Sequence, residues 1–158
     1  MMDAHLPWLA PDWQRQIQLV LNSYAQCVGT ELIDRSGNAE EQAQRLFDAP
    51  FVVVSHGTQA DPILNSANAI ALRLWAMPRE QFLETPSRLT AEPMHRDERE
   101  RMLEQTRRKR YIDEYQGIRI SSNGRRFRID RATVWNVVDE QGQPAGQAAT
   151  FTEWVFLD

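Results

Sequence analysis

Cysteine and positive charge are scarce in this sequence, and each shortage excludes a class of protein. The single cysteine, Cys27, permits no internal disulfide, and no second cysteine or histidine lies at metal-ligand spacing from it, which excludes a structural zinc site. Lysine and arginine total 18 against 22 aspartates and glutamates, a net charge of -4. No overall positive field therefore favours nucleic acid or an anionic membrane.

Long apolar runs are also missing. No run approaches the roughly 18 residues that a membrane-spanning helix needs. The stretch Met1–His5 lacks the basic region and apolar core of a signal peptide. We therefore expect a cytoplasmic protein that contacts neither membranes nor nucleic acids.

The composition suits one domain with a modest core. Hydrophobic residues make up 42% and charged residues 25% of the 158 positions. We expect a helical extension over residues 1–48, which packs on a sheet or on a partner subunit, and an α+β domain over residues 49–158.

The last third of the chain predicts a three-stranded antiparallel meander. Strand-like runs lie at 117–122, 125–138 and 146–156, separated by Asn123-Gly124 and by residues 139–142. Asn-Gly between alternating runs is a strong hairpin signal, because both residues tolerate the positive φ of a tight turn.

Shorter elements precede the meander. Asp12 is predicted to cap an amphipathic helix that ends at Gly29, and Asn38 with Glu41 has the spacing of a capping box. Further expected elements are strands at 51–54 and 62–65, helices opening at Asn68 and Pro78, and a longer helix from about Pro93 to about Arg110.

The long strand of the meander alternates with a period of two. Residues of one parity are expected on one buried face: Phe127, Ile129, Thr133, Trp135 and Val137. Arg131 shares this parity, and a buried guanidinium must find a carboxylate, a carbonyl or a bound anion, unless strand twist lets it reach solvent. The second half of the other face is apolar, and the first helix can cover it.

Six segments carry a resemblance to a known family. They are VVSHG at 53–57, DPILNSANAIALRLW at 61–75, PSRLTAEP at 86–93, GIRISSNGRRFRI at 117–129, ATVWNVVDEQG at 132–142 and GQAATF at 146–151. Together they resemble the MEKHLA family, a relative of PAS domains found alone in bacteria and at the C-terminus of plant homeodomain leucine-zipper regulators. The resemblance implies an α+β fold with a five-stranded antiparallel sheet and helices on one face.

The same resemblance assigns two residues. Asn68 resembles the asparagine that opens the first PAS helix. Ala76 stands where many PAS domains have glycine, which we interpret as a turn that needs no positive φ. PAS relatives bind haem, flavin or small metabolites between helices and sheet, or bind nothing and pair with proteins, so the resemblance leaves the ligand open.

The residues argue against two of these cofactors. A cysteinyl-flavin adduct needs a thiol on a helix that lines the pocket, and Cys27 lies outside that region. Haem needs an axial ligand, and the candidate His95 stands in a strongly charged stretch, which favours a solvated histidine. Noncovalent flavin stacked on Trp75 or Trp135, or a small metabolite, remains open.

His56 ends a buried strand, where its imidazole can contact a ligand or fix the next turn through a loop carbonyl, the role we favour. Ser55 and His56 point to opposite faces of a strand, so they form no catalytic pair. A small enzyme that uses His56 and Asp61 is only a third alternative.

Arg126 and Arg128 share a face with Asp130, which favours a salt-bridged surface over a nucleic-acid site.

We therefore predict a PAS-like sensory and regulatory module that holds a small, partly apolar ligand between helices and sheet. The expected ligand-binding residues are His56, Asn68, Leu72, Trp75, Leu103, Phe127, Ile129, Arg131, Thr133 and Trp135. The alternative is a ligand-free interaction or dimerisation domain that uses the first helix and the outer sheet face.

Overall fold

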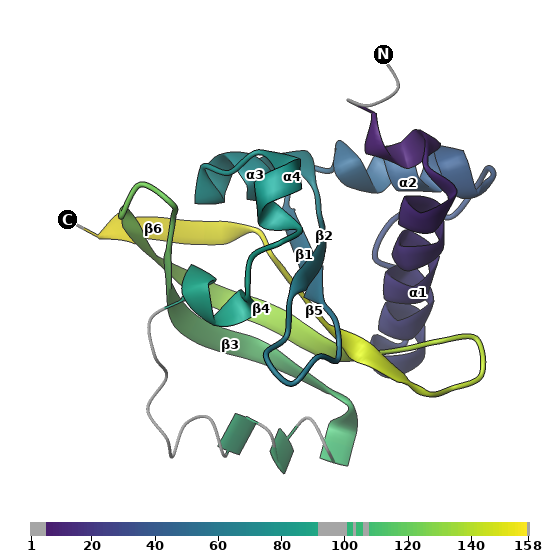
Figure 1. The fold of residues 1–158 in the computed structure, drawn as a ribbon. Coiled ribbons are helices and arrows are strands. Elements are labelled where there is room, and N and C mark those ends of the chain that lie inside the picture. The colour runs from purple at the N-terminus through teal and green to yellow at the C-terminus, as the bar shows by residue number, and fades with distance from the viewer. Residues whose placement is uncertain (1–5, 92–100, 103, 106–107, 158) are drawn as a thin grey trace.

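One antiparallel sheet lies between two groups of helices (Figure 1). The computed structural model describes residues 6–91, 101–102, 104–105 and 108–157. The helical elements are η2 (Pro7–Leu9), α1 (Pro11–Val28), α2 (Ala39–Phe47), α3 (Ala69–Trp75), α4 (Arg79–Phe82) and η3 (Ser87–Thr90). The strands are β1 (Val52–His56), β2 (Leu64–Ala67), β3 (Tyr111–Ile120), β4 (Arg126–Val138), β5 (Pro144–Phe151) and β6 (Glu153–Leu157).

The sheet has the order β2-β1-β5-β4-β3, and β6 continues along β4 beyond the end of β5. The predicted meander is confirmed, although β3 begins at Tyr111 rather than at Gly117. The turn between β3 and β4 is closed by the Ser121 amide, which donates to the Arg125 carbonyl at 2.9 Å, and Gly124 has the positive φ that the Asn-Gly signal predicts. The predicted α+β sheet with an N-terminal helix is therefore present.

Strand β4 contains a bulge at Arg131. Across the β3–β4 ladder Tyr115 pairs with Ala132 and Gly117 pairs with Ile129, so two residues of β4 stand opposite one residue of β3. Arg131 has a φ of +57°, in the left-handed region. An extra residue of this kind reverses the side-chain parity of everything that follows it in the strand.

The bulge divides the residues that alternation placed on one face. Phe127 and Ile129 lie in the hydrophobic cluster on the inner side of the sheet, beside α3 and α4. Trp135 and Val137 lie in a second cluster on the outer side, beside α1 and α2. The predicted single face is therefore wrong beyond residue 130.

Helix α1 covers the outer face of the sheet at the second half of β4 (Figure 1). It lies over Trp135 and Val137 and not over the predicted Ala132 and Val134, which the bulge turns to the inner side. The Trp135 indole donates to the Val20 carbonyl at 3.2 Å, and the Val138 amide donates to Ser23 Oγ at 2.9 Å. These bonds fix the helix on the strand. The division of the chain at residue 48 stays a prediction.

The predicted helix ends are largely confirmed. Asn38 and Glu41 form the capping box of α2, Asn68 caps α3, and Gly29 ends α1 with a φ of +92°. Asp12 does not cap α1, because Pro11 is already its first residue.

Most of the predicted helix over 93–110 lies outside the described residues, and those described at 101–102, 104–105 and 108–109 are helical. No described helix combines the length and apolar character needed to cross a bilayer.

Ala76 corrects the interpretation that its turn needs no positive φ. It ends α3 with a φ of +57° and a ψ of +46°, and its carbonyl accepts a hydrogen bond from Ser122 Oγ at 2.5 Å. A left-handed conformation costs a non-glycine residue about 1–2 kcal/mol, whereas glycine adopts it freely.

We expect Ala76→Gly to raise the free energy of unfolding by about 0.5–1 kcal/mol, since relief of the left-handed cost exceeds the added entropy of the unfolded chain. Urea unfolding measures the change. Ala25→Gly, inside α1, is the matched control and is expected to lower stability by about 1 kcal/mol. A loss in both variants would contradict the backbone conformation at Ala76.

Candidate functional site

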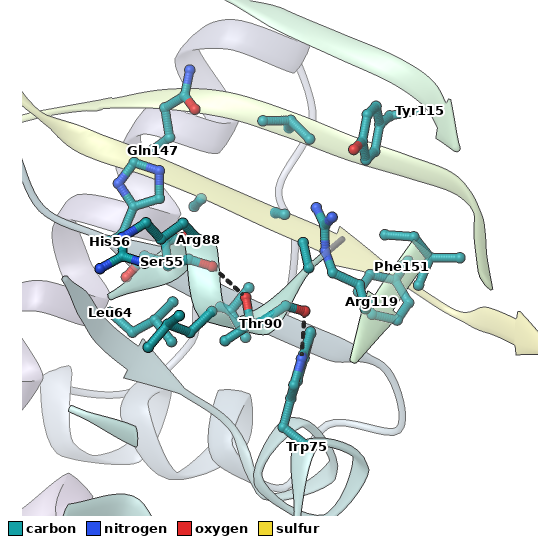
Figure 2. Close-up of a pocket in the computed structure, with 18 of the residues that line it drawn as sticks. Ser55, His56, Leu64, Trp75, Arg88, Thr90, Tyr115, Arg119, Gln147 and Phe151 are labelled. Atoms are coloured by element: carbon teal, nitrogen blue, oxygen red, sulfur yellow. Dashed lines mark hydrogen bonds between the residues drawn. The ribbon is translucent and has the colours of Figure 1, made fainter. Parts of the chain in front are cut away.

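A cavity of about 730 Å³ lies between the inner face of the sheet and the segment from α3 to η3 (Figure 2). Its apolar walls come from five strands: Val54 of β1, Leu64 of β2, Ile120 of β3, Ile129 and Val134 of β4, and Ala149 and Phe151 of β5. The volume lies within the range of about 300–1,000 Å³ that small-molecule sites occupy.

The two ends of the cavity are polar. Figure 2 shows His56 and Gln147 together at one end and Arg119 at the other, on the side of Tyr115 and Phe151. His56 Nδ1 lies 2.9 Å from the Gly57 carbonyl oxygen, which can only accept. Nδ1 is therefore the donor in this contact, which leaves Nε2 for a ligand.

Helix η3 forms the wall opposite the sheet. Thr90 Oγ1 donates to the Ser87 carbonyl at 2.7 Å, and the Trp75 indole donates to the Thr90 carbonyl at 3.1 Å (Figure 2). Arg88 lies at the edge of this wall, and its Nε is 3.1 Å from a carboxylate oxygen of Asp61. These bonds hold the wall against α3 and against the β1–β2 loop.

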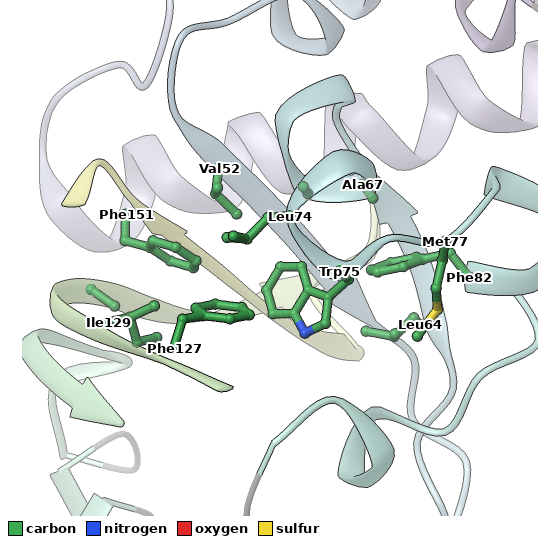
Figure 3. Packing of buried hydrophobic residues seen from close by; sticks show 12 residues of the cluster. Val52, Leu64, Ala67, Leu74, Trp75, Met77, Phe82, Phe127, Ile129 and Phe151 are labelled. Carbon is green, nitrogen blue, oxygen red and sulfur yellow. The ribbon is translucent and has the colours of Figure 1, made fainter. Parts of the chain in front are cut away.

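An aromatic cluster borders the cavity (Figure 3). The Trp75 ring centroid lies 5.4 Å from that of Phe127, 6.2 Å from that of Phe82 and 6.3 Å from that of Phe151, all in edge-to-face arrangements. Trp75 is only 2% exposed, so it has no free face on which a flavin could stack.

Three of the predicted ligand-binding residues line this cavity: His56, Trp75 and Ile129. Phe127 is fully buried in the adjacent cluster, and Leu72 packs against that cluster without lining the cavity. Leu103 and the haem-ligand candidate His95 lie outside the described residues.

Asn68 holds the backbone together instead of facing the cavity. Its side chain accepts from the amides of Val53 and Ala71, at 3.2 and 3.3 Å, and donates to the carbonyls of Phe51 and Leu46, at 2.5 and 3.4 Å. All of its hydrogen-bonding capacity is therefore used within the fold.

The structure places the last three predicted residues elsewhere. Arg131 is exposed at the bulge, so it is not a buried charge. Trp135 is fully buried against α1, on the outer face, and Thr133 shares its parity in β4. The physical reason for all three misplacements is the one extra residue in β4.

Sequence reasoning missed the cavity residues of β3 and β5. Tyr115 and Arg119 stand opposite Ala132 and Phe127, on the inner face. A two-residue Asn-Gly loop would pair Phe127 with Ile120, whereas the observed register pairs it with Arg119. Ala149 is paired with Val134, which regular alternation along β4 places on the opposite face, so the bulge hid this residue as well.

Covalent and metal chemistry find no support near the cavity. The Cys27 thiol lies on α1, 3.5 Å from the Arg110 carbonyl oxygen, and burial raises its pKa, with Arg110 opposing. A thiol on the outer side of the sheet cannot reach a ligand on the inner side. No group of three metal-binding side chains occurs among the residues that the structure describes.

His56 and Asp61 are engaged with different partners, the Gly57 carbonyl and Arg88. The enzyme alternative therefore gains no support from geometry.

On the outer face Asp130 accepts hydrogen bonds from Gln116 at 2.6 Å and from Arg128 at 3.2 Å, which lower the pKa of its carboxyl. This pair agrees with the predicted salt-bridged surface.

Solved structures with the same fold are PAS and light-oxygen-voltage domains. A PAS domain from Colwellia psychrerythraea is 13% identical, with a TM-score of 0.59 over 70% of this chain and 92% of that chain. The light-state dimer of the fungal blue-light photoreceptor Vivid is 12% identical, with a TM-score of 0.55 over 85% and 93%. A light-oxygen-voltage domain studied with a flavin analogue is 12% identical, with a TM-score of 0.55 over 75% and 85%.

These likenesses show the fold alone, because the identities are low. No curated protein sequence matches the chain. The sequence model of the MEKHLA domain matches residues 14–156, which include almost all of α1 and every strand. The chain therefore belongs to the MEKHLA family, and its fold is that of PAS domains.

Proposed function

We propose that this MEKHLA domain is a sensory module that binds a small, partly apolar ligand in the cavity between α3, η3 and the inner sheet face. The observation that supports it is the lining of that cavity, which combines apolar walls from five strands with hydrogen-bonding groups at both ends. Ligand sites are typically apolar pockets with a few convergent polar groups.

The cavity does not single out a flavin. Cys27 lies on the other side of the sheet, and Trp75 has no exposed face for stacking. A flavin would therefore have to bind noncovalently, as one of several ligands of this size. An absorption spectrum of the purified protein identifies it directly.

The signal has a route to a protein partner on the outer face of the sheet. Helix α1 covers the second half of β4, whereas β6 pairs with the first half. Val155 of β6 is 48% exposed beside Arg128, on the outer face beyond α1. This apolar exposure also favours the alternative of an interaction or dimerisation domain without a ligand.

Filling the cavity tests the ligand. Ala149 stands between Val54 and Val134 in the sheet, and all three line the cavity. We expect Ala149→Leu to weaken binding of the neutral fluorophore Nile red at least about 10-fold and to remove any ligand seen by native mass spectrometry, because the added carbons occupy the ligand volume.

Stability should not fall in this variant, since the new side chain fills space. Ala60→Leu, an exposed site in the β1–β2 loop, is the matched control and should leave Nile red binding unchanged. If the purified protein never carries a ligand, and Nile red binds equally to the wild-type protein, Ala149→Leu and Ala60→Leu, the ligand proposal is wrong. The alternative of an interaction domain without a ligand would then stand. The native mass spectra also report the oligomeric state.

A further inference from the structure

The two arginines that line the cavity differ in their partners. Arg88 forms an ion pair with Asp61, with 3.1 Å between Nε and the nearer carboxylate oxygen. Arg119, half-buried on the inner face of β3, has no acidic partner within the described part of the chain. Its guanidinium carbon lies 5.6 Å from the centre of the Tyr115 ring.

The local sequence brings Tyr115 and Arg119 together. Both side chains lie on the inner face of β3, and Gly117 stands between them. The Tyr115 hydroxyl lies 2.5 Å from the place where a Cβ of residue 117 would be, so the missing side chain makes room for the ring. The ring and the guanidinium therefore form one end of the cavity.

The N–H groups of Arg119 have no acceptor among the residues that the structure describes, and the contact with the Tyr115 ring supplies none. A guanidinium has five donors in one plane, and a cation–π contact uses the charge but not these hydrogens. Unpaired donors at an apolar cavity are unfavourable, and a carboxylate is their best complement because it accepts two parallel hydrogen bonds. The Tyr115 hydroxyl, which has no hydrogen-bond partner among the described residues, can donate to the same group.

We propose that the ligand is a small apolar carboxylate, bound with its carboxylate on Arg119 and its apolar body along the walls of β4 and β5. The opposite end has His56 and Gln147, and the Arg88 guanidinium beside them is already paired with Asp61. The charge distribution thus gives the ligand one orientation. This inference rests on the proposed function, because it names the chemical class that the same cavity binds.

Decanoate and decanol form a matched pair of probes that differ in charge. We expect the wild-type protein to bind decanoate at least about 10-fold more tightly than decanol, measured by displacement of Nile red. Arg119→Gln should bind the two within about 3-fold of each other, with the decanol affinity unchanged. Arg88→Gln is the matched control and should keep the preference for decanoate, because Arg88 is already paired with Asp61.

Arg119→Lys separates loss of charge from loss of fold, and it should retain part of the preference. Equal affinities for decanoate and decanol in the wild-type protein would overturn the carboxylate inference and leave the proposed function standing. The same holds if Arg119→Gln keeps the preference. Failure of decanoate, decanol and Nile red to bind at all would overturn both proposals.

Discussion

Gly146→Ala is expected to lower the free energy of unfolding by about 3–5 kcal/mol, a large part of the total stability of a domain. Gly146 has a φ of +124°, well outside the left-handed region near +50 to +70° that other residues enter. A Cβ there would lie 1.9 Å from the carbonyl oxygen of His56 and 2.9 Å from its carbonyl carbon. Both are backbone atoms, so no side-chain rotation relieves the contact, and β5 must move away from β1.

Gly142→Ala is the control that isolates this contact. Gly142 also has a positive φ, +79°, but its Cβ would meet nothing within 4 Å. Its expected cost is therefore only the left-handed penalty of about 1–2 kcal/mol. Thermal unfolding should show the difference, since each kcal/mol lowers Tm by about 2–4 °C in a chain of this size. Equal losses in the two variants would show that β5 does not approach His56 so closely.

The close approach at Gly146 also shapes the cavity. The next residue, Gln147, pairs with His56 across β1 and β5, and these two side chains form the end of the cavity opposite Arg119. A glycine in a strand marks either a bulge or a close contact between backbones. At Gly146 the close contact between the backbones of β1 and β5 determines the shape of the cavity at its His56 end.

Local signals predicted most of the fold. The capping box of Asn38 and Glu41, the cap at Asn68 and the Asn123-Gly124 hairpin each depend on a few adjacent residues, and the structure shows all of them. Such signals are informative because the partners are fixed by chain spacing of three or four residues.

The side-chain face of the long strand could not be predicted in the same way. Alternation holds only while the ladder is regular, and a bulge shifts it by one residue. The bulge stands at Arg131, a residue type that carries no signal for a positive φ. Before this point Ile129 lines the cavity, whereas after it Thr133 and Trp135 fall on the other face.

The role of the first helix was ambiguous for a different reason. An apolar stripe that includes Trp13 and Ile17 can cover the chain's own sheet or a partner's surface equally well. The structure uses it internally, with the Trp135 indole bonded to the Val20 carbonyl. This stripe is therefore not free for a partner, which agrees with placing the proposed partner surface at the end of the sheet that β6 forms.

Asn68→Ala is expected to lower stability by about 3–4 kcal/mol. The asparagine is 2% exposed and joins three parts of the chain: the end of α2, the start of β1 and the first turn of α3. Loss of a helix cap costs about 1 kcal/mol. The amide of Val53 and the carbonyl of Phe51 also lose their side-chain partner, and each buried unpaired group costs about 1–3 kcal/mol.

Two further variants separate capping from burial. Asn38→Ala removes an exposed cap of the same kind in α2 and should cost only about 1 kcal/mol, measured by urea unfolding. Asn68→Asp keeps the cap acceptor but places a carboxylate against the Phe51 and Leu46 carbonyls, so it should be as harmful as Asn68→Ala at neutral pH. At acid pH the free energy of unfolding of Asn68→Asp should rise above that of Asn68→Ala, because a protonated carboxyl again donates a hydrogen bond. Equal costs for Asn38→Ala and Asn68→Ala would mean that the buried bonds of Asn68 add nothing beyond the cap.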